Sequence, residues 1–379
     1  MGIVSGVIVR KYLFITVFLF LLSGTLPCLA ADVMLLHSDS QGSYRGNHVR
    51  QGVLQTLQTK DNSLHVVEFW LEADKNTSEE HFDDVAEKLA QRLKQHPVQG
   101  VICVGEAALA MLQRYRSHVF GTIPATFCCV ENFEPRMARD GHCTGITSKP
   151  GLERLFDIVL ALHPKARTVA VFTDQTPESS ELRRQAQIAF ERHMDRIQLV
   201  LPGFEAGREG GLTKKQALQI AQGMPKNGLI LMARFVRDNT DAYVQQDDLT
   251  RKMAESATVP VYVLREEDMA AATAGGFMVN EMKHGQQAAQ QLLKLMAGAS
   301  LSSQPVARLP RYWQFNALPM QRATTDFAQV PKNAEVTGLP KQAQWFPLPP
   351  GLAALGGIAL GALVVFLLRR KSKGKNRSS

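Results

Sequence analysis

The chain has 379 residues and a formal net charge of +8, from 43 lysines and arginines against 35 aspartates and glutamates. All of the excess lies at the two ends: Arg10 and Lys11 near the start, and six basic residues after Leu368, with no acidic residue in either terminal region. The long segment between the ends is therefore neutral overall, which excludes the broad basic surface that nucleic-acid binding requires.

The first 30 residues have the pattern of a signal peptide. An apolar run from Tyr12 to Leu22 follows two basic residues, and small residues stand before Ala31. We place the cleavage after Ala30. A lipoprotein cysteine at Cys28 is disfavoured because a proline precedes it. An uncleaved anchor is the remaining alternative, although the run is shorter than the ~20 residues of a membrane span.

The chain ends with a second apolar segment, residues 350–368, followed by the basic tail 369–379. As a helix, Gly351 to Leu368 would be roughly 27 Å long, close to the thickness of a bilayer core. Positive charges mark the cytoplasmic side of a span. We therefore expect a single-pass protein of a bacterial inner membrane, with a periplasmic or extracytoplasmic main domain and a cytoplasmic C-terminus. A stripe of small residues in the segment would allow a homodimer through the span: Ala353, Gly357 and Gly361.

After the signal peptide, the first predicted unit is a strand, a polar loop and a helix. The apolar residues from Val33 to Leu36 predict a buried strand, and a polar run from His37 to Ser43 follows. Val49, Val53 and Leu57 then recur at helical spacing. In an open α/β sheet such a loop lies at the carboxyl end of a strand, beside a helix N-terminus, where ligands bind. An ordinary connecting loop is the alternative for any single loop, but this unit recurs along the chain.

Strands and helices alternate through residue 147. A capping box of Thr77 and Glu80 precedes an amphipathic helix that contains Phe82, and Glu106 opens another helix. The further strands of this half are expected at 64–71, 100–105, 123–130 and 144–147.

The alternation restarts after residue 147. A helix that begins near Leu152 is stopped at His163 and Pro164. The further helices are expected at 179–194, around 217–220, at 247–256 and at 285–297. The strands are expected at 168–172, 197–201, 228–233, 259–264 and 276–279.

This alternation predicts parallel sheets joined by right-handed crossovers. The expected fold class is α/β, with two Rossmann-like lobes and a C-terminal transmembrane helix. We expect lobe 1 at residues 31–147, completed by about 273–300, and lobe 2 at 148–272. Residues 301–349 would form a final crossing and a linker.

Four cysteines remain after removal of the signal peptide, and none has the spacing of a metal site. We expect no metal and no other cofactor. Export allows one disulfide, and buried free thiols are an equally open alternative. Our hypothesis is that Cys143 pairs with Cys128 or Cys129 and closes a short loop at the edge of lobe 1.

Three stretches carry a resemblance to a known family: VMLLHSDSQGSYRGNHVRQG near the start, LHPKARTVAVFTD in the middle, and NGLILMARFVRD with VPVYVLRE and GGFMVNEMKHGQQAAQQLLKLMAG later. Taken in order, they resemble the ABC-transporter-type solute-binding proteins. The most similar branch is tryptophan/tyrosine-binding-like and also serves as an extracellular sensor domain. The resemblance covers roughly residues 33–324. It implies the type I periplasmic-binding-protein fold, with hinge strands between the lobes and a final crossing over Arg311 to Thr324. The first loop departs from the family, because Ser38-Asp39-Ser40 lacks its usual aromatic residue.

On this fold the loops at the carboxyl ends of the strands would face a cleft between the lobes. Arg234 is the most favoured ligand contact, because a charge at the end of an apolar strand needs a partner, either a ligand or a carboxylate. For each residue alone, a solvated loop or an interlobe salt bridge is the alternative. The full set of expected cleft residues is His37, Ser38, Asp39, Gln41, Gly105, Glu106, Glu131, Asn132, Thr173, Asp174, Arg234, Arg237, Arg265 and Glu266.

The sequence does not favour an enzyme. His37, Ser38 and Asp39 are consecutive at a strand end, so their side chains point to different sides and cannot form a relay. No GxSxG, P-loop, HExxH or dinucleotide fingerprint is present. We expect a membrane-anchored solute-binding protein that captures a small molecule for an ABC permease or for a membrane sensor. The alternative is a ligand-free scaffold that docks on such a sensor or transporter.

Overall fold

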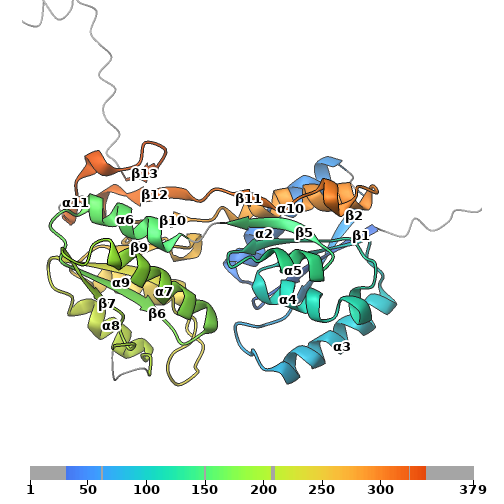
Figure 1. Cartoon of the computed structure of the whole chain (residues 1–379), viewed down its shortest axis with the longest axis horizontal. Helices are drawn as coiled ribbons and strands as arrows, with labels where there is room; N and C mark the ends of the chain where they lie inside the picture. Colours follow the sequence, from blue (N-terminus) through green and yellow to red (C-terminus); the bar gives the residue numbers. More distant parts are fainter. Residues whose placement is uncertain (1–30, 61–62, 149–150, 206–209, 324, 339–379) are drawn as a thin grey trace, which may run out of the picture. The chain divides into compact units, whose positions relative to one another are not determined.

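The computed structural model describes residues 31–60, 63–148, 151–205, 210–323 and 325–338. The predicted signal peptide, the predicted span at 350–368 and the basic tail lie outside these ranges. Within them, no helix combines the length and the apolar character that a membrane crossing needs. The described chain forms two sheets, each with its own helices (Figure 1).

The first sheet has the order β11-β5-β4-β3-β1-β2, and every pairing along it is parallel. A strand order that reverses around β1 gives a doubly wound sheet with helices on both faces. Its strands are β1 (Ala31–His37), β2 (Leu64–Trp70), β3 (Gly100–Val104), β4 (Ala125–Val130), β5 (Thr144–Ser148) and β11 (Ala307–Leu309).

Two separate apolar clusters cover the faces of this sheet. One contains Leu89 and Leu109 from the helices α3 and α4, and the other contains Val53 and Leu292 from α2 and α10. The helix α3 is capped by Ser78, which accepts a hydrogen bond from the His81 amide, so the predicted cap at Thr77 was one residue too early. The helices of this lobe are α2 (Tyr44–Lys60), α3 (Glu79–Gln95), α4 (Glu106–Arg114), α5 (Pro135–Asp140) and α10 (Glu281–Met296).

The second sheet has the order β13-β12-β10-β9-β8-β6-β7. Its pairs from β7 to β10 are parallel, whereas β12 runs antiparallel to β10. The strands are β6 (Thr168–Thr173), β7 (Gln198–Val200), β8 (Gly228–Arg234), β9 (Val261–Val263), β10 (Gly275–Met278), β12 (Tyr312–Asn316) and β13 (Glu335–Thr337). The helices are α6 (Leu152–Leu162), α7 (Pro177–Glu191), α8 (Lys214–Gln222), α9 (Gln246–Ser256) and α11 (Ala317–Arg322).

The chain returns to the first lobe later than the sequence suggested. The strand β10 belongs to the second sheet, so the return begins after Met278 and includes α10 and β11. The expected start of this return at residue 273 was too early. The final crossing is also short, because only Pro310 and Arg311 separate β11 in the first sheet from β12 in the second.

The helix α10 lies against α2, although the two are far apart in the sequence (Figure 1). Glycines allow the backbones to touch. A Cβ atom on Gly52 would be 2.1 Å from the carbonyl oxygen of Met282, and one on Gly285 would be 2.4 Å from that of Val49. This contact attaches the late helix to the first lobe.

The four described cysteines are all buried free thiols, which contradicts the predicted disulfide. Cys143 belongs to the apolar cluster of α3 and α4, whereas Cys128 and Cys129 belong to the cluster on the opposite face of the sheet. Cys129 has a positive φ of 58°, and the register of β4 shifts there, so two consecutive residues contribute to one face. The sheet therefore separates the thiols that we expected to pair.

Candidate ligand-binding cleft

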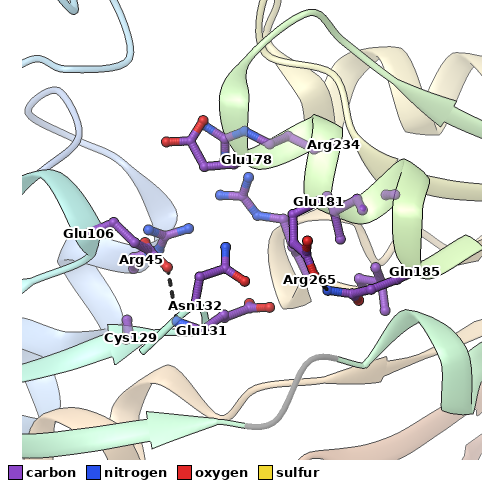
Figure 2. Close-up of a pocket in the computed structure, with 13 residues that line it drawn as sticks. Arg45, Glu106, Cys129, Glu131, Asn132, Glu178, Glu181, Gln185, Arg234 and Arg265 are labelled. Atoms are coloured by element: carbon purple, nitrogen blue, oxygen red, sulfur yellow. Dashed lines mark hydrogen bonds between the residues drawn. The ribbon is translucent and has the colours of Figure 1, made fainter. Parts of the chain in front are cut away.

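A small cavity lies where residues from the carboxyl ends of both sheets meet, and its volume is about 70 Å³ (Figure 2). We call it the central cavity. The first lobe contributes residues at the end of β4 and after β1, β3 and β4. The second lobe contributes residues at the end of β8 and after β6 and β9. Its lining consists of Arg45, Glu106, Cys129, Glu131, Asn132, Glu178, Glu181, Leu182, Gln185, Ala233, Arg234, Leu264 and Arg265.

Two larger cavities flank the central one. A cavity of about 420 Å³ shares Arg234 and Arg265 with it and extends along the loop after β1 to Tyr243. A cavity of about 590 Å³ shares Glu106 and Glu131 with it. We refer to the three together as the cleft.

Arg45, in the first turn of α2, is the main cation on the side of the first lobe. Its Nε lies 3.8 Å from Asp39 Oδ2 and 3.7 Å from Glu281 Oε1. Burial opposes its charge, but nearby acidic groups, Asp39 above all, outweigh burial and raise the pKa of Arg45. Burial likewise opposes ionisation of Asp39, and Arg45 followed by Arg265 outweighs it and lowers the pKa of Asp39. Both groups are therefore charged at neutral pH.

Arg265 lies two residues after the end of β9 and is a largely buried cation of the second lobe, with 14% of its side chain exposed. One end nitrogen, Nη2, pairs with Glu267. The other two nitrogens, Nε and Nη1, are buried and have no hydrogen-bond partner within the described part of the chain. Burial opposes its charge, but Glu267 outweighs burial and the pKa of Arg265 is raised.

Glu106 and Glu131 lie side by side at the ends of β3 and β4. The Glu131 amide donates a hydrogen bond to Glu106 Oε1 at 2.9 Å, and Glu131 Oε2 lies 2.6 Å from Arg311 Nη2. Burial raises the pKa of Glu106. Burial also opposes ionisation of Glu131, but Arg311 outweighs it and lowers that pKa. The carboxylate of Glu131 is thus already paired with a cation.

Arg234 ends β8 and enters the cleft from the second lobe (Figure 2). Its Nε lies 3.4 Å from the hydroxyl of Thr176. Within the described residues, no carboxylate forms an ion pair with it. The sequence led us to expect either a ligand or a carboxylate as the partner of Arg234, and no carboxylate pairs with it among the described residues. The side chain lines two cavities of the cleft.

The structure brings eight of the fourteen expected residues to the cleft. Seven line one or more of the three cavities, and Glu266 lines a small adjoining cavity that also contains Arg45, Arg265 and Glu281. The eight are Asp39, Gln41, Glu106, Glu131, Asn132, Arg234, Arg265 and Glu266.

The other six expected residues line none of these cavities. The ring of His37 stacks on Trp70 with a centroid distance of 3.7 Å, and burial lowers its pKa to about 4. The hydroxyl of Ser38 donates to the Val104 carbonyl and accepts from the Ala108 amide. The remaining four are Gly105, Thr173, Asp174 and Arg237.

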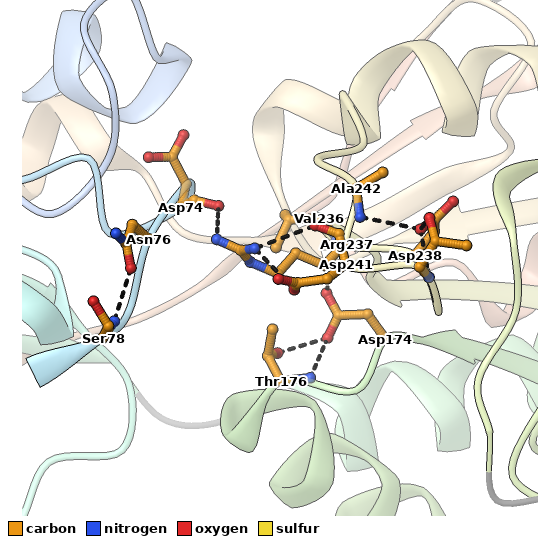
Figure 3. A network of polar contacts seen from close by, with 11 residues as sticks. Asp74, Asn76, Ser78, Asp174, Thr176, Val236, Arg237, Asp238, Asp241 and Ala242 are labelled. Atoms are coloured by element: carbon orange, nitrogen blue, oxygen red, sulfur yellow. Dashed lines mark hydrogen bonds and ion pairs between the residues drawn. The ribbon is translucent and has the colours of Figure 1, made fainter. Parts of the chain in front are cut away.

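Asp174 organises the loop after β8, as Figure 3 shows. Its Oδ2 accepts hydrogen bonds from the amides of Val236, at 2.8 Å, and Arg237, at 3.4 Å. Its Oδ1 accepts from Thr176 and Ser179 on the neighbouring loop and helix. Asp174 is 2% exposed and both of its carboxylate oxygens accept hydrogen bonds, so this residue stabilises the loop and is not free to bind a ligand.

The loop that Asp174 holds carries a contact between the lobes. Arg237 Nη2 donates a hydrogen bond of 2.9 Å to the carbonyl oxygen of Asp74, in the loop after β2 of the first lobe (Figure 3). Its Nη1 pairs with Asp241 in its own loop. We call the contact between Arg237 and Asp74 the interlobe latch.

Sequence reasoning missed several residues that line the cleft or the small cavity beside it. Arg45, Glu178 and Glu281 share one position, the first turn of a helix that follows a strand. In a parallel α/β unit this turn lies at the same sheet edge as the loop before it. Searching the first turn as well as the loop would have found them. Glu181 and Gln185 lie one and two turns further along α7.

No protein-family model matches the chain, and no curated protein matches it in sequence. Solved structures match its fold. An ABC domain from Streptococcus pneumonia in complex with L-Trp has a TM-score of 0.57 and 11% identity, and the match covers 81% of this chain and 99% of that one. The chain has the type I periplasmic-binding-protein fold.

Two further structures with this fold show its range. A substrate-binding protein with adhesive properties from Clostridium difficile, in a ligand-free open structure, has a TM-score of 0.56 and 13% identity over 81% of this chain and 98% of that one. An ABC transporter solute-binding protein from Bacillus halodurans with bound myo-inositol has a TM-score of 0.52 and 10% identity over 80% and 100%. Because an amino acid and a polyol occupy related folds, the type I fold alone does not identify a ligand.

Proposed function

We propose that this protein is a membrane-anchored, extracytoplasmic solute-binding protein that captures a small polar molecule in its cleft. The observation that carries the proposal is the convergence of charged side chains from both lobes on the central cavity. Arg45 comes from the first lobe, and Arg234 and Arg265 come from the second. A molecule that contacts both sets binds the closed arrangement more tightly than the open one, and thereby drives closure.

The proposal includes the anchor and the downstream partner. The apolar segment 350–368 and the basic tail after it support a single span, with the cleft outside the cytoplasm. A tethered binding protein would deliver its ligand to an ABC permease or present its closed form to a membrane sensor. Both outputs require the same closed state.

The binding role is tested by native mass spectrometry of the full-length protein purified from its own host in detergent. We expect a mass excess of a few hundred daltons that denaturation releases as a small molecule. Protein that carries no such molecule, and whose melting temperature does not change with a host metabolite extract, would contradict ligand binding. That result would favour the ligand-free docking protein instead.

The anchor is tested separately with spheroplasts of the host. We expect the protein in the membrane fraction, and protease added from outside should digest the main domain and leave a small C-terminal fragment. Full-length protein released by osmotic shock would overturn the anchor without affecting the binding role.

A further inference from the structure

The proposed solute-binding function does not specify the chemical class of the ligand. The side chains that line the central cavity indicate which class fits. We propose that the ligand is a small organic anion whose oxyanion group, a carboxylate or a phosphate, is bound by Arg265 together with Arg45 and Arg234. This inference rests on the proposed function and names the class of molecule that the same cleft takes.

Arg265 carries the argument, because its guanidinium is buried and only partly satisfied. Nη2 pairs with Glu267, whereas Nε and Nη1 have no partner within the described residues. A buried donor without an acceptor is costly, and the cost is larger for a charged group. An oxyanion is the acceptor best suited to a guanidinium, since it can accept two charge-assisted hydrogen bonds at once.

The arrangement of the other cations points the same way. Arg45 and Arg265 extend toward one another from the two lobes (Figure 2), and the charge of Arg45 opposes that of Arg265. Arg234 enters the same cavity from β8. An anion among the three would relieve this repulsion, and it would do so only when the lobes are close.

Two of the four glutamates that line the cavity are paired with other cations, which leaves the three arginines less neutralised than the lining suggests. Glu131 pairs with Arg311, and Glu181 pairs with Arg184, a residue of α7 that does not line the cavity. Asp39 lies 3.8 Å from Arg45, too far for a strong hydrogen bond. Arg265 and Arg234 are thus the cations that the ligand would complement most directly.

Two further features of the lining refine the class. Gln185 Oε1 is buried without a partner within the described chain, so a ligand N–H or O–H would meet it. No aromatic side chain is among the described residues that line the central cavity. Sugars and indoles usually bind against aromatic rings. The cavity therefore suits a compact anion with a hydrogen-bond donor better than it suits a hexose or an indole.

The test uses the full-length protein, freed of bound molecules, and two probes made from a host metabolite extract. Anion exchange separates the extract into a retained fraction of anions and an unretained fraction. We expect only the retained fraction to raise the melting temperature. Arg265→Gln should require about tenfold to a hundredfold more of that fraction for the same shift, and Arg265→Lys should lie between. Arg251→Gln is the matched control, because Arg251 is an exposed arginine of α9 paired with Asp248 and Glu255.

The outcomes separate this inference from the function on which it rests. A shift with the unretained fraction alone would overturn the anionic ligand and leave solute binding intact, whereas no shift with either fraction would remove both. Undiminished binding by Arg265→Gln would exclude Arg265 as the anion contact. If that variant fails to fold, Arg234→Gln replaces it, because Arg234 is only partly buried. Phosphatase treatment of the retained fraction distinguishes the two oxyanions, since it abolishes the shift only for a phosphate ester.

Discussion

At the scale of single residues, Glu281 shows how burial changes the protonation state of a carboxyl group beside the cleft. It lies in the first turn of α10, is 6% exposed, and is 3.7 Å from Arg45. Burial raises its pKa to about 8, although Arg45 acts in the opposite direction. The folded protein therefore holds this carboxyl group protonated at neutral pH.

This pKa predicts a specific pH dependence of stability. Between the ordinary value of 4.5 and the folded value of about 8, the unfolded chain releases the proton and the folded chain keeps it. The free energy of unfolding should therefore fall as pH rises through this window, by at most about 1.4 kcal/mol per pH unit from this group. Below pH 4.5 the group is protonated in both states and its contribution is fully present. Glu281→Gln should remove this component.

The measurement is the melting temperature of both proteins from pH 5 to pH 8.5. The wild-type value should decline more steeply than that of Glu281→Gln across the window. Glu80→Gln, at an exposed position of α3, is the control. Parallel curves for wild type and Glu281→Gln would show that Glu281 ionises normally.

The sequence predicted the location of cleft residues better than their roles. Arg234 and Arg265, which the sequence places at the ends of apolar strands, both line the central cavity, because strand ends share one sheet edge. Asp174 also follows a strand end, but nearby backbone amides engage it fully. Which polar group meets which amide depends on tertiary packing, and the sequence alone does not contain that information.

At the scale of elements, the contact between α2 and α10 is the closest helix packing described above. Gly285→Ala would place a methyl group 2.4 Å from a backbone carbonyl that cannot move without shifting α2. We expect a loss of about 1–3 kcal/mol in the free energy of unfolding, despite the better helix propensity of alanine.

Chemical denaturation of the variant and of Gly223→Ala provides the comparison. A Cβ atom on Gly223 would have its nearest neighbour at 3.4 Å, an ordinary contact, so that variant should be close to wild type. Equal stability of the two variants would mean that the helices separate at little cost.

Long elements were predicted well, whereas several short ones were missed. The buried runs of β3, β4 and β8 and the amphipathic pattern of α3 are visible in the sequence because burial repeats along the whole element. The three-residue strand β11 and the six-residue helices α5 and α11 were missed. An element that short has too few residues to show a period, and its partner sheet determines its conformation.

At the scale of the whole folded unit, Arg311 lies where the chain last crosses between the lobes. Its side chain, 2% exposed, reaches Glu131 in the first lobe and donates to the carbonyls of Leu264 and Phe277 in the second. The interlobe latch of Arg237 lies at another point of contact. We therefore expect the crossing at Arg311 to stay in place when the cleft opens, and the hydrogen bond between Arg237 and Asp74 to break.

The latch makes a prediction about this closure. Arg237→Gln removes a hydrogen bond worth about 1 kcal/mol, which should shift the ratio of closed to open protein by about fivefold. Small-angle X-ray scattering of the ligand-free protein should show a larger radius of gyration. Asp241→Asn changes the other partner of Arg237 and leaves the contact to Asp74, so it should scatter like wild type. Identical scattering from all three proteins would exclude the latch as a determinant of closure.

The late position of α10 has a consequence for how the protein is made. The first lobe begins at β1, yet its second apolar cluster is filled by Ala288 and Leu292 of α10, and its sheet ends with β11 at Leu309. These segments are synthesised late, after both lobes have begun. The lobe that starts first is thus completed only when almost the whole folded unit has been synthesised, and until then Val53 and Leu57 lack the helix that covers them. Nascent chains stopped near residue 280 should therefore expose an apolar face of the first lobe, while most of the second sheet is already present.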